Sequence, residues 1–266
     1  MAKLAKSIVN KFKSEGSSAP VNPVAITKLS DYFSVIHALY KANPVYWYRG
    51  HSDSTYLLTP SALRYSTLTE RNTAIGLVDT FKRYAESKLR RIPLDHDQLR
   101  WLQVAQHYGI ATRLLDWTEN AAVGLYFACN GKSQKDGVVY LMNPLDLNSA
   151  VVPKNPTIFD GVKDIKVIKP YLKLKGGKLK RGRPTIAINP VWNSDRISQQ
   201  QGVFTLHGSR NFEIDSSQAP SLVKIPIRKT DKNNLLVELD RVGVNEHSIF
   251  PEIEHLSSYL KWKNGL

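Results

Sequence analysis

The sequence predicts an α+β fold in which N-terminal helices pack on a mostly antiparallel β core. In the first half of the chain, apolar residues recur at helical spacing over several stretches. In the second half, short β-branched runs alternate with turn residues, as is typical of strands. Helices that come first and strands that follow are the pattern of the α+β class.

Length and composition indicate one globular domain after a short tail. The chain has 266 residues, of which 42% are hydrophobic, so global disorder is excluded. Residues 1–22 are basic and end in a stretch rich in Ser, Gly and Pro. We therefore expect a flexible tail there and a single domain over 23–266. The one cysteine, Cys129, excludes an internal disulfide framework and a cysteine-built zinc site.

The hydropathy pattern favours a protein without membrane contacts. No apolar run reaches the roughly 20 residues of a membrane-spanning helix. The N-terminal residues alternate Lys with apolar residues and lack the unbroken apolar core of a signal peptide. We therefore expect a cytoplasmic location.

The first elements along the chain are a helix and a strand. Ser30 has the residue type of an N-cap, and Asn43-Pro44 ends the helix that it begins. The inward face of this helix is predicted to consist of Phe33, Ile36, Leu39 and Tyr40. A β-branched and aromatic run over 45–49 then predicts a strand that Gly50 ends, which places Arg49 at the strand's exit.

Three further helices complete the first half. Two are predicted over 70–90 and 97–108, and Gly109 has the residue type that ends the second. After an extended piece over 110–115, an almost wholly apolar helix covers 121–129 and is predicted to be buried.

The elements of the second half are shorter. Strands are predicted over 137–142, 185–188, 202–206 and 222–227. Two short helices close the chain, and the last of them begins at Pro251.

A group of polar residues between positions 100 and 120 is the first candidate site. Its members lie where buried elements are predicted to join, and they are Gln106, His107, Thr112, Arg113, Asp116 and Thr118. Charged side chains beside an apolar helix must be paired or hydrogen-bonded. Arg113 and Asp116 could therefore form a structural ion pair, or Asp116 or Thr118 could cap the helix. His107 could bond a carbonyl group at its helix end.

The net charge points to a polyanionic partner. The chain carries 37 Lys+Arg against 23 Asp+Glu, a net charge of +14, which creates a field that attracts nucleic acid. The strongest cluster lies in one Gly-containing stretch, and its cations are Lys173, Lys175, Lys178, Lys180, Arg181 and Arg183. We expect these residues to contact RNA or DNA, although a basic loop without a partner has the same composition.

The sequence lacks the motifs of several kinds of catalytic and binding site. No histidine pair has the helical spacing that binds zinc, and no carboxylate cluster has metal spacing, so we expect no metal. A Gly-rich phosphate loop, a G-x-G-x-x-G motif and a nucleophile elbow are also missing.

The polar segments resemble the FRG domain family, named for its Phe-Arg-Gly motif. Here Tyr48-Arg49-Gly50-His51-Ser52 stands in that place, with Tyr48 for the phenylalanine. The other matching stretches are Leu58-Thr59-Pro60-Ser61 with Arg64, the string from Gln106 to Thr118, Arg196 with the Gln200–Thr205 run, and Phe250-Pro251.

The order of elements also resembles an ADP-ribosyltransferase, an enzyme that transfers ADP-ribose from NAD to a target. This resemblance implies that Arg49 holds the NAD phosphates and that Thr112 supports the nicotinamide ribose. Gly50, Arg113 and Tyr126 would help to bind NAD, and His107 and Asp116 would orient or polarise it. Gln199, Gln200 or Gln201, just ahead of a later strand, would stand where many transferases carry a catalytic glutamate.

The glutamine run departs from the transferase pattern, because glutamine carries no charge. Asp116 or Glu213 could supply a carboxylate instead, as could Glu252 and Glu254. The leading hypothesis is an NAD-dependent ADP-ribosyltransferase that modifies nucleic acid, acts as a bacterial toxin or phage-defence effector, and is restrained by an inhibitory protein partner.

Two other functions fit the residues. In a non-enzymatic nucleic-acid-binding module, Tyr46, Trp47, Tyr48 and Trp101 would stack bases. In a metal-independent nuclease, His107 and Asp116 would act as acid and base.

Overall fold

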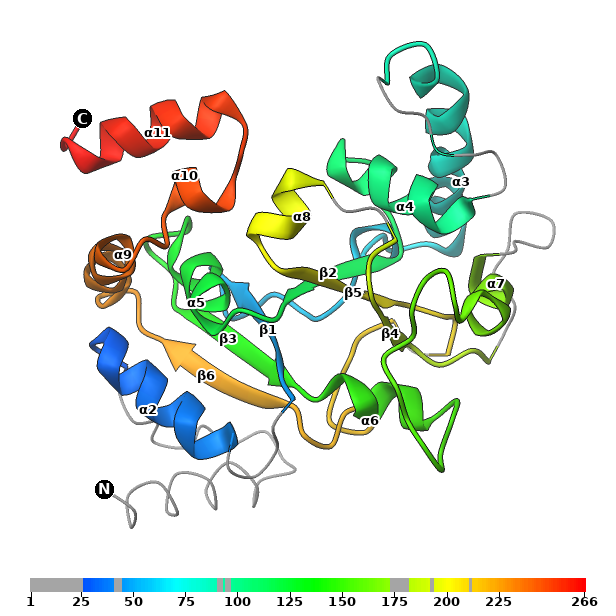
Figure 1. Cartoon of the computed structure of the whole chain (residues 1–266), viewed down its shortest axis with the longest axis horizontal. Coiled ribbons are helices and arrows are strands. Elements are labelled where there is room, and N and C mark those ends of the chain that lie inside the picture. The colour runs from blue at the N-terminus through cyan, green and yellow to red at the C-terminus, as the bar shows by residue number, and fades with distance from the viewer. Residues whose placement is uncertain are drawn as a thin grey trace.

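The computed structural model describes residues 26–40, 45–89, 93, 97–172, 182–191, 194–210 and 212–266. Its centre is a six-stranded sheet with helices at both ends (Figure 1). The tail predicted over 1–22 lies outside the described residues. So do five of the six predicted nucleic-acid contacts, Lys173, Lys175, Lys178, Lys180 and Arg181.

The sheet confirms the α+β class and the antiparallel core. Its strands are β1 (Trp47–His51), β2 (Leu114–Thr118), β3 (Gly137–Met142), β4 (Ile186–Ile188), β5 (Gly202–Leu206) and β6 (Val223–Ile227). They lie in the order β4-β5-β2-β1-β3-β6, and all neighbouring strands pair antiparallel.

The sheet is nearly divided between β1 and β2. Strand β1 pairs with β3 at five successive positions, but with β2 only at Tyr48 opposite Thr118. Two three-stranded halves, β4-β5-β2 and β1-β3-β6, therefore meet at one residue pair. Beyond that pair, side chains rather than backbone bonds must bridge the two halves.

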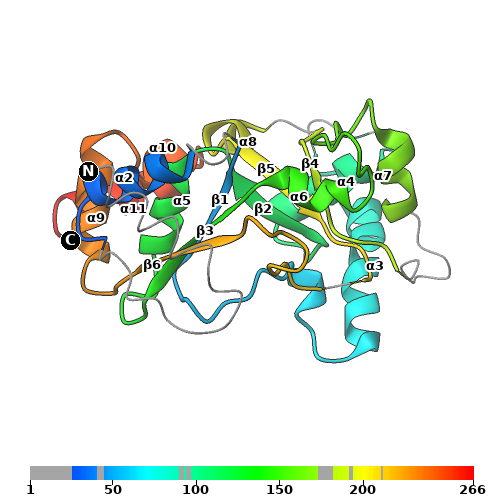
Figure 2. The same cartoon turned by 90° about the horizontal axis from the view of Figure 1, so that it is seen from below.

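The helices gather at the two ends of the molecule (Figure 2). Beside β6 and β3 lie α2 (Leu29–Tyr40), α5 (Ala121–Cys129), α9 (Lys232–Arg241), α10 (Glu246–Ile249) and α11 (Ile253–Lys263). Beside β4 and β5 lie α3 (Leu68–Ala85), α4 (Gln98–His107) and α7 (Ile165–Leu172). The shorter pieces are the 3₁₀ turn η1 (Ser61–Leu63), α6 (Pro144–Ser149) and α8 (Asp195–Gln199).

Helix α5 packs unusually close to β1, and two glycines allow this. A Cβ atom on Gly50 would lie 2.1 Å from the Gly124 carbonyl oxygen, and one on Gly124 would lie 2.8 Å from the Tyr48 Cβ. As predicted, α5 is buried and belongs to the core cluster that includes Tyr48, Val139 and Leu235.

Several predicted elements begin or end elsewhere. Gly50 does not end the first strand, because β1 continues to His51 and Arg49 lies inside it. Asp116 and Thr118 do not cap α5, because both belong to β2; the side chain of Asn120 caps the helix by accepting from the N–H groups of Ala122 and Val123.

The inward face of α2 also differs from the prediction. Phe33 and Tyr40 are exposed, whereas Tyr32 and Val35 join Ile36 and Leu39 in the core. The hydroxyl group of Tyr32 donates to the Ala121 carbonyl, which gives this buried side chain its polar partner.

Other predictions are confirmed. The second long helix has Asp97 as its N-cap, and Gly109 follows its C-terminus with a φ of +83°. None of the helices within the described ranges is long and apolar enough to cross a bilayer.

Candidate functional site

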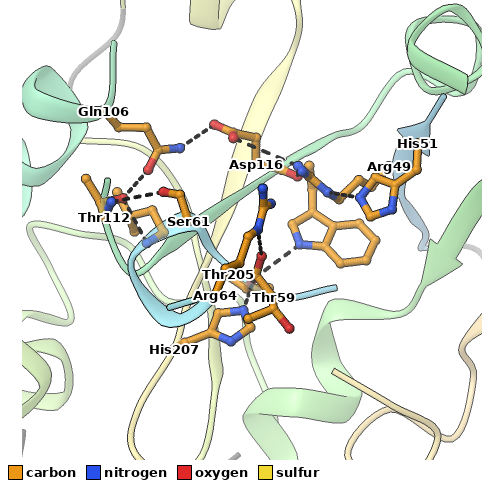
Figure 3. Close-up of polar contacts among 12 residues, drawn as sticks. Arg49, His51, Thr59, Ser61, Arg64, Gln106, Thr112, Asp116, Thr205 and His207 are labelled. Carbon is orange, nitrogen blue, oxygen red and sulfur yellow. Dashed lines mark hydrogen bonds and ion pairs between the residues drawn. The ribbon is translucent and has the colours of Figure 1, made fainter. Parts of the chain in front are cut away.

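Arg49 bridges the two halves of the sheet where β1 and β2 part. Its Nη1 donates to the carbonyl oxygen of Asp116 at 2.5 Å and lies 3.9 Å from the carboxylate oxygen Oδ2 of the same residue (Figure 3). Burial lowers the pKa of Arg49 to about 10, which leaves the guanidinium charged at neutral pH. A cation is therefore held at the point where the backbone ladder stops.

His51 fixes the other side of this guanidinium. Arg49 Nε donates to His51 Nε2 at 2.8 Å, and His51 Nδ1 lies 3.1 Å from the carbonyl oxygen of Tyr56. The ring can satisfy both contacts only as a neutral imidazole with its proton on Nδ1. Burial and the charge of Arg49 both lower the pKa of His51, to about 3, in agreement with that form.

Asp116 begins a second line of hydrogen bonds that leads away from Arg49. Gln106 Nε2 donates to Asp116 Oδ1 at 2.6 Å, and the Thr112 hydroxyl group donates to Gln106 Oε1. The Thr112 N–H group donates to Ser61 Oγ at 3.2 Å. The whole chain of contacts therefore runs from His51 to Ser61 and joins α4, β1, β2 and the segment between β1 and α3 (Figure 3).

Arg49, Gln106 and Asp116 of this line border a cavity of about 260 Å³, which we call the split cavity. Of the residues predicted from the sequence, it brings together Arg49, Gly50, Gln106, His107, Asp116, Thr118 and Gln200. Its apolar lining includes Trp117, Phe127 and Phe204. A cation, hydrogen-bonding side chains and flat apolar surfaces in one concavity are the features of a site for a polar, ring-containing ligand.

His107 lines the split cavity at the C-terminus of α4. Burial and the charge of Arg196 lower its pKa, and Glu252 opposes that shift. The imidazole is therefore neutral at pH 7, and a neutral imidazole can accept a proton.

Arg196 on α8 is a second cation in the split cavity, and reasoning from the residues alone did not assign it. Its guanidinium lies 4.8 Å from the ring centre of Phe250, and its Nη1 lies 4.0 Å from Glu252 Oε1. Gln200 follows Arg196 at helical i, i+4 spacing, which is the signal that could have placed both on one face.

Gln200 joins the cavity to the C-terminal helices. Its Nε2 donates to the Ile249 carbonyl at 3.3 Å, and its own carbonyl accepts from the Thr118 hydroxyl group at 2.6 Å. Gln201 is exposed, has a φ of +46° and accepts from the Glu119 N–H group through its carbonyl. The structure therefore places Gln200, but not Gln201, at the cavity.

Three other predicted residues have different positions. Thr112 does not line the split cavity but holds Gln106, which does. Tyr126 lies on a separate cavity beside α9 and α10, where its hydroxyl oxygen accepts from Asn130. Arg113 is buried, and its guanidinium donates to the carbonyl groups of His207 and Tyr171.

The structural ion pair predicted between Arg113 and Asp116 is wrong. Asp116 faces Arg49 and Gln106, because its place in β2 turns it to the opposite side from its neighbours in the strand. Arg183, the described member of the basic stretch, stacks its guanidinium 5.3 Å from the ring centre of Tyr171. In the described ranges, no group of His, Cys, Asp and Glu side chains could hold a metal ion.

Comparison with known proteins identifies part of the chain. Residues 44–137 match the model of the FRG domain. No curated protein and no solved structure matches the chain. The matched segment holds the hydrogen-bond line from His51 to Ser61, whereas Arg196 and Gln200 come from outside it. Residues 44–137 are thus similar to the FRG domain, and elements from outside this segment complete the cavity.

Proposed function

We propose that this protein is an ADP-ribosyltransferase that uses NAD as co-substrate and modifies nucleic acid. The observation that carries the proposal is the position of Arg49 in the split cavity, next to Asp116 and together with His107 and Gln200. The transferase resemblance implied that Arg49 lies on the first strand and Gln200 just ahead of a later one; β1, which holds Arg49, and β5, which Gln200 precedes, both lie next to β2 in the sheet.

The cations of the cavity suit the pyrophosphate of NAD. Arg49 is charged and oriented by His51, and Arg196 adds a second guanidinium on α8. A guanidinium binds phosphate oxygens through two parallel N–H groups, which gives both affinity and orientation. Phe127, Trp117 and Phe204 offer apolar surface for a ring.

Bound NAD supplies an activated ADP-ribosyl group. In the transfer, the bond between the ribose carbon and the nicotinamide nitrogen breaks, and its electron pair leaves with the neutral nicotinamide. The acceptor atom forms the new bond to that carbon and loses a proton. Asp116 would stabilise the positive charge that develops on the ribose, and the neutral His107 would accept the proton.

Gln200 would position the ligand in this scheme. Its side-chain amide is directed toward Ile249 and carries no charge, so it can hydrogen-bond but cannot offset a developing cation. The carboxylate role therefore falls to Asp116, which lines the cavity beside Arg49.

The proposed acceptor is RNA or DNA because of the charge. The net charge of +14 favours polyanions, and the basic stretch from Lys173 to Arg183 would follow their phosphates. A role as toxin or phage-defence effector, with an inhibitory protein partner, belongs to the same proposal.

The test is the intact mass of short RNA and DNA oligomers after incubation with the full chain and NAD. We expect the mass of one ADP-ribose to be added and nicotinamide to be released in equal amount. Arg49→Ala should abolish both while the protein stays folded. Arg228→Ala is the matched control, because Arg228 forms its ion pair with Asp231 outside the cavity.

Each other result has a definite meaning. Nicotinamide release with unchanged oligomers would replace nucleic acid by another acceptor. Shortened oligomers would favour the nuclease, with His107 and Asp116 in its site. If NAD is not consumed and the oligomers bind in a salt-sensitive way, the function is that of the binding module, and the transferase proposal is overturned.

A further inference from the structure

A second cavity, of about 200 Å³, lies between α3, α4 and α7, and we call it the helix cavity. Asp79 and Lys82 of α3 and Trp101 of α4 line it, as do Thr112 and Arg113 just before β2. The proposed transferase reaction uses none of the charged groups in it, so its polar lining requires a separate explanation.

Arg113 is the unusual group in this lining. The residue is only 2% exposed, and two of its guanidinium nitrogens donate to main-chain carbonyl groups. Its Nε has no hydrogen-bond partner, and no described carboxylate forms an ion pair with it. A buried charge is normally paired, because the transfer of an ion from water into the protein interior costs several kcal/mol.

A second donor in the same lining also lacks an acceptor. The indole Nε1 of Trp101 is buried without a hydrogen-bond partner, and the residue is 1% exposed. The Lys82 ammonium lies 5.6 Å from the centre of its ring. The described residues of the lining therefore include two with an unsatisfied N–H donor, two cations and one carboxylate, that of the exposed Asp79.

We propose that the helix cavity binds a small oxyanion, a phosphate or carboxylate group, whose oxygens accept from Trp101 and Arg113. Several water molecules, at about 30 Å³ each, would also fit the volume. Water could satisfy the two N–H groups, but it would leave the guanidinium charge without a counter-ion among the residues that the structure describes. An oxyanion meets both requirements at once.

The lowered pKa of Arg113, about 10, has burial as its cause and agrees with a cation that lacks a carboxylate partner. The neighbouring His207 gives no compensation, because it is itself buried and its pKa is lowered to about 3. The proposal does not depend on the transferase reaction, since the helix cavity would bind its anion whatever the split cavity does.

The first measurement is a titration of the full chain with inorganic phosphate, followed through the indole N–H resonances by NMR. We expect the Trp101 resonance, identified by its absence in Trp101→Phe, to move downfield and saturate. Sodium chloride at the same ionic strength is the reference. Acetate is the second probe, and the tighter of the two ligands distinguishes a phosphate from a carboxylate source.

Variants then test the contacts by calorimetry. Trp101→Phe keeps the ring and removes the donor, so phosphate affinity should fall about tenfold, the effect of one hydrogen bond to an anion. Trp47→Phe is the matched control, because Trp47 Nε1 is also buried without a partner but does not line the helix cavity. Its affinity should equal that of the wild type.

Substitution of two charged residues at the cavity should change the phosphate affinity in opposite directions. Lys82→Met should weaken phosphate binding several-fold, whereas Asp79→Asn should strengthen it by removing a like charge. Asp79 is exposed, so its substitution does not endanger the fold. An indole response that is the same in chloride, or affinities that ignore all three substitutions, would overturn the proposal and leave a water-filled cavity.

Discussion

At the scale of single residues, the site consists of polar groups that hydrogen-bond to one another. Arg49 is held by His51 and Asp116, and Asp116 by Gln106. Each member has one place in the line, so a change at one residue removes a partner from its neighbour. An unsatisfied buried group costs about 1–3 kcal/mol, more than the hydrogen bond itself contributes.

Substitution of His51 should therefore destabilise the protein through lost hydrogen bonds and not only through lost packing. His51→Leu leaves Arg49 Nε without its acceptor and the Tyr56 carbonyl with the Tyr140 hydroxyl group as its remaining donor, and we expect a loss of about 1–3 kcal/mol in unfolding free energy. His51→Gln restores an acceptor near Nε2 and should lose less than half of that. Urea unfolding at pH 7 measures both, and equal losses in the two variants would show that only packing matters here.

The same burial predicts how stability depends on pH. The pKa values of His51 and His207 are lowered to about 3, from about 6.5 in an unfolded chain. Between these values the unfolded state binds more protons, so the unfolding free energy falls as the pH falls from about 6.5 toward 3. Each histidine contributes up to about 1.4 kcal/mol per pH unit.

Urea unfolding between pH 4 and 7 checks this dependence. The slope of unfolding free energy against pH should be smaller for His51→Gln than for the wild type, by the contribution of one proton. An unchanged slope would mean that His51 is protonated in the folded protein, in conflict with its acceptor role toward Arg49.

At the scale of elements, the position of the cavity depends on the close contact between α5 and β1. Gly50→Ala would place a methyl group 2.1 Å from the Gly124 carbonyl oxygen, and backbone atoms cannot move aside easily. We expect a loss of about 3 kcal/mol or more, because α5 must shift away from the sheet. Thermal and urea unfolding measure it.

Gly76→Ala is the matched substitution. Gly76 lies inside α3, and a Cβ atom there would meet nothing within 4 Å. Alanine should therefore stabilise the protein by about 0.5–1 kcal/mol through its helix propensity. If both substitutions destabilise alike, the contact between α5 and β1 is not what requires glycine.

Elements with a strong local signal were predictable from the sequence, and their junctions were not. Helix α4 has Asp97 at its start and Gly109 after its end, and α5 is apolar on all sides, so each could be located from the residues. The end of β2 was missed because Asp116 has the residue type of a helix cap. Only the antiparallel partner β5 shows that it belongs to a strand.

The candidate site was predictable to a similar degree. Residues of one motif string, such as Gln106, His107 and Asp116, were assigned together because they are close in the sequence. Arg196 contributes from a five-residue helix that has no buried residue and hence no periodicity to detect. The separation of Arg113 from the split cavity depends on how β2 pairs, which no local pattern contains.

At the scale of the whole molecule, the charge should control association with nucleic acid. Replacement of the six cations between Lys173 and Arg183 by glutamine should flatten the plot of log affinity against log salt for single-stranded RNA. Its slope should fall by up to about four units, since each phosphate contact contributes about 0.7. Fluorescence anisotropy at salt concentrations between about 50 and 300 mM measures this slope. A slope that does not change would place the nucleic acid on another surface.

Thr112 stands between the two cavities. Its side chain borders the helix cavity, and its hydroxyl group holds Gln106, which borders the split cavity and bonds Asp116. Any anion that shifts Thr112 must therefore change the free energy of a ligand beside Asp116. Thermodynamic linkage then makes the effect mutual: the factor by which the anion alters that ligand's affinity equals the factor by which the ligand alters the anion's.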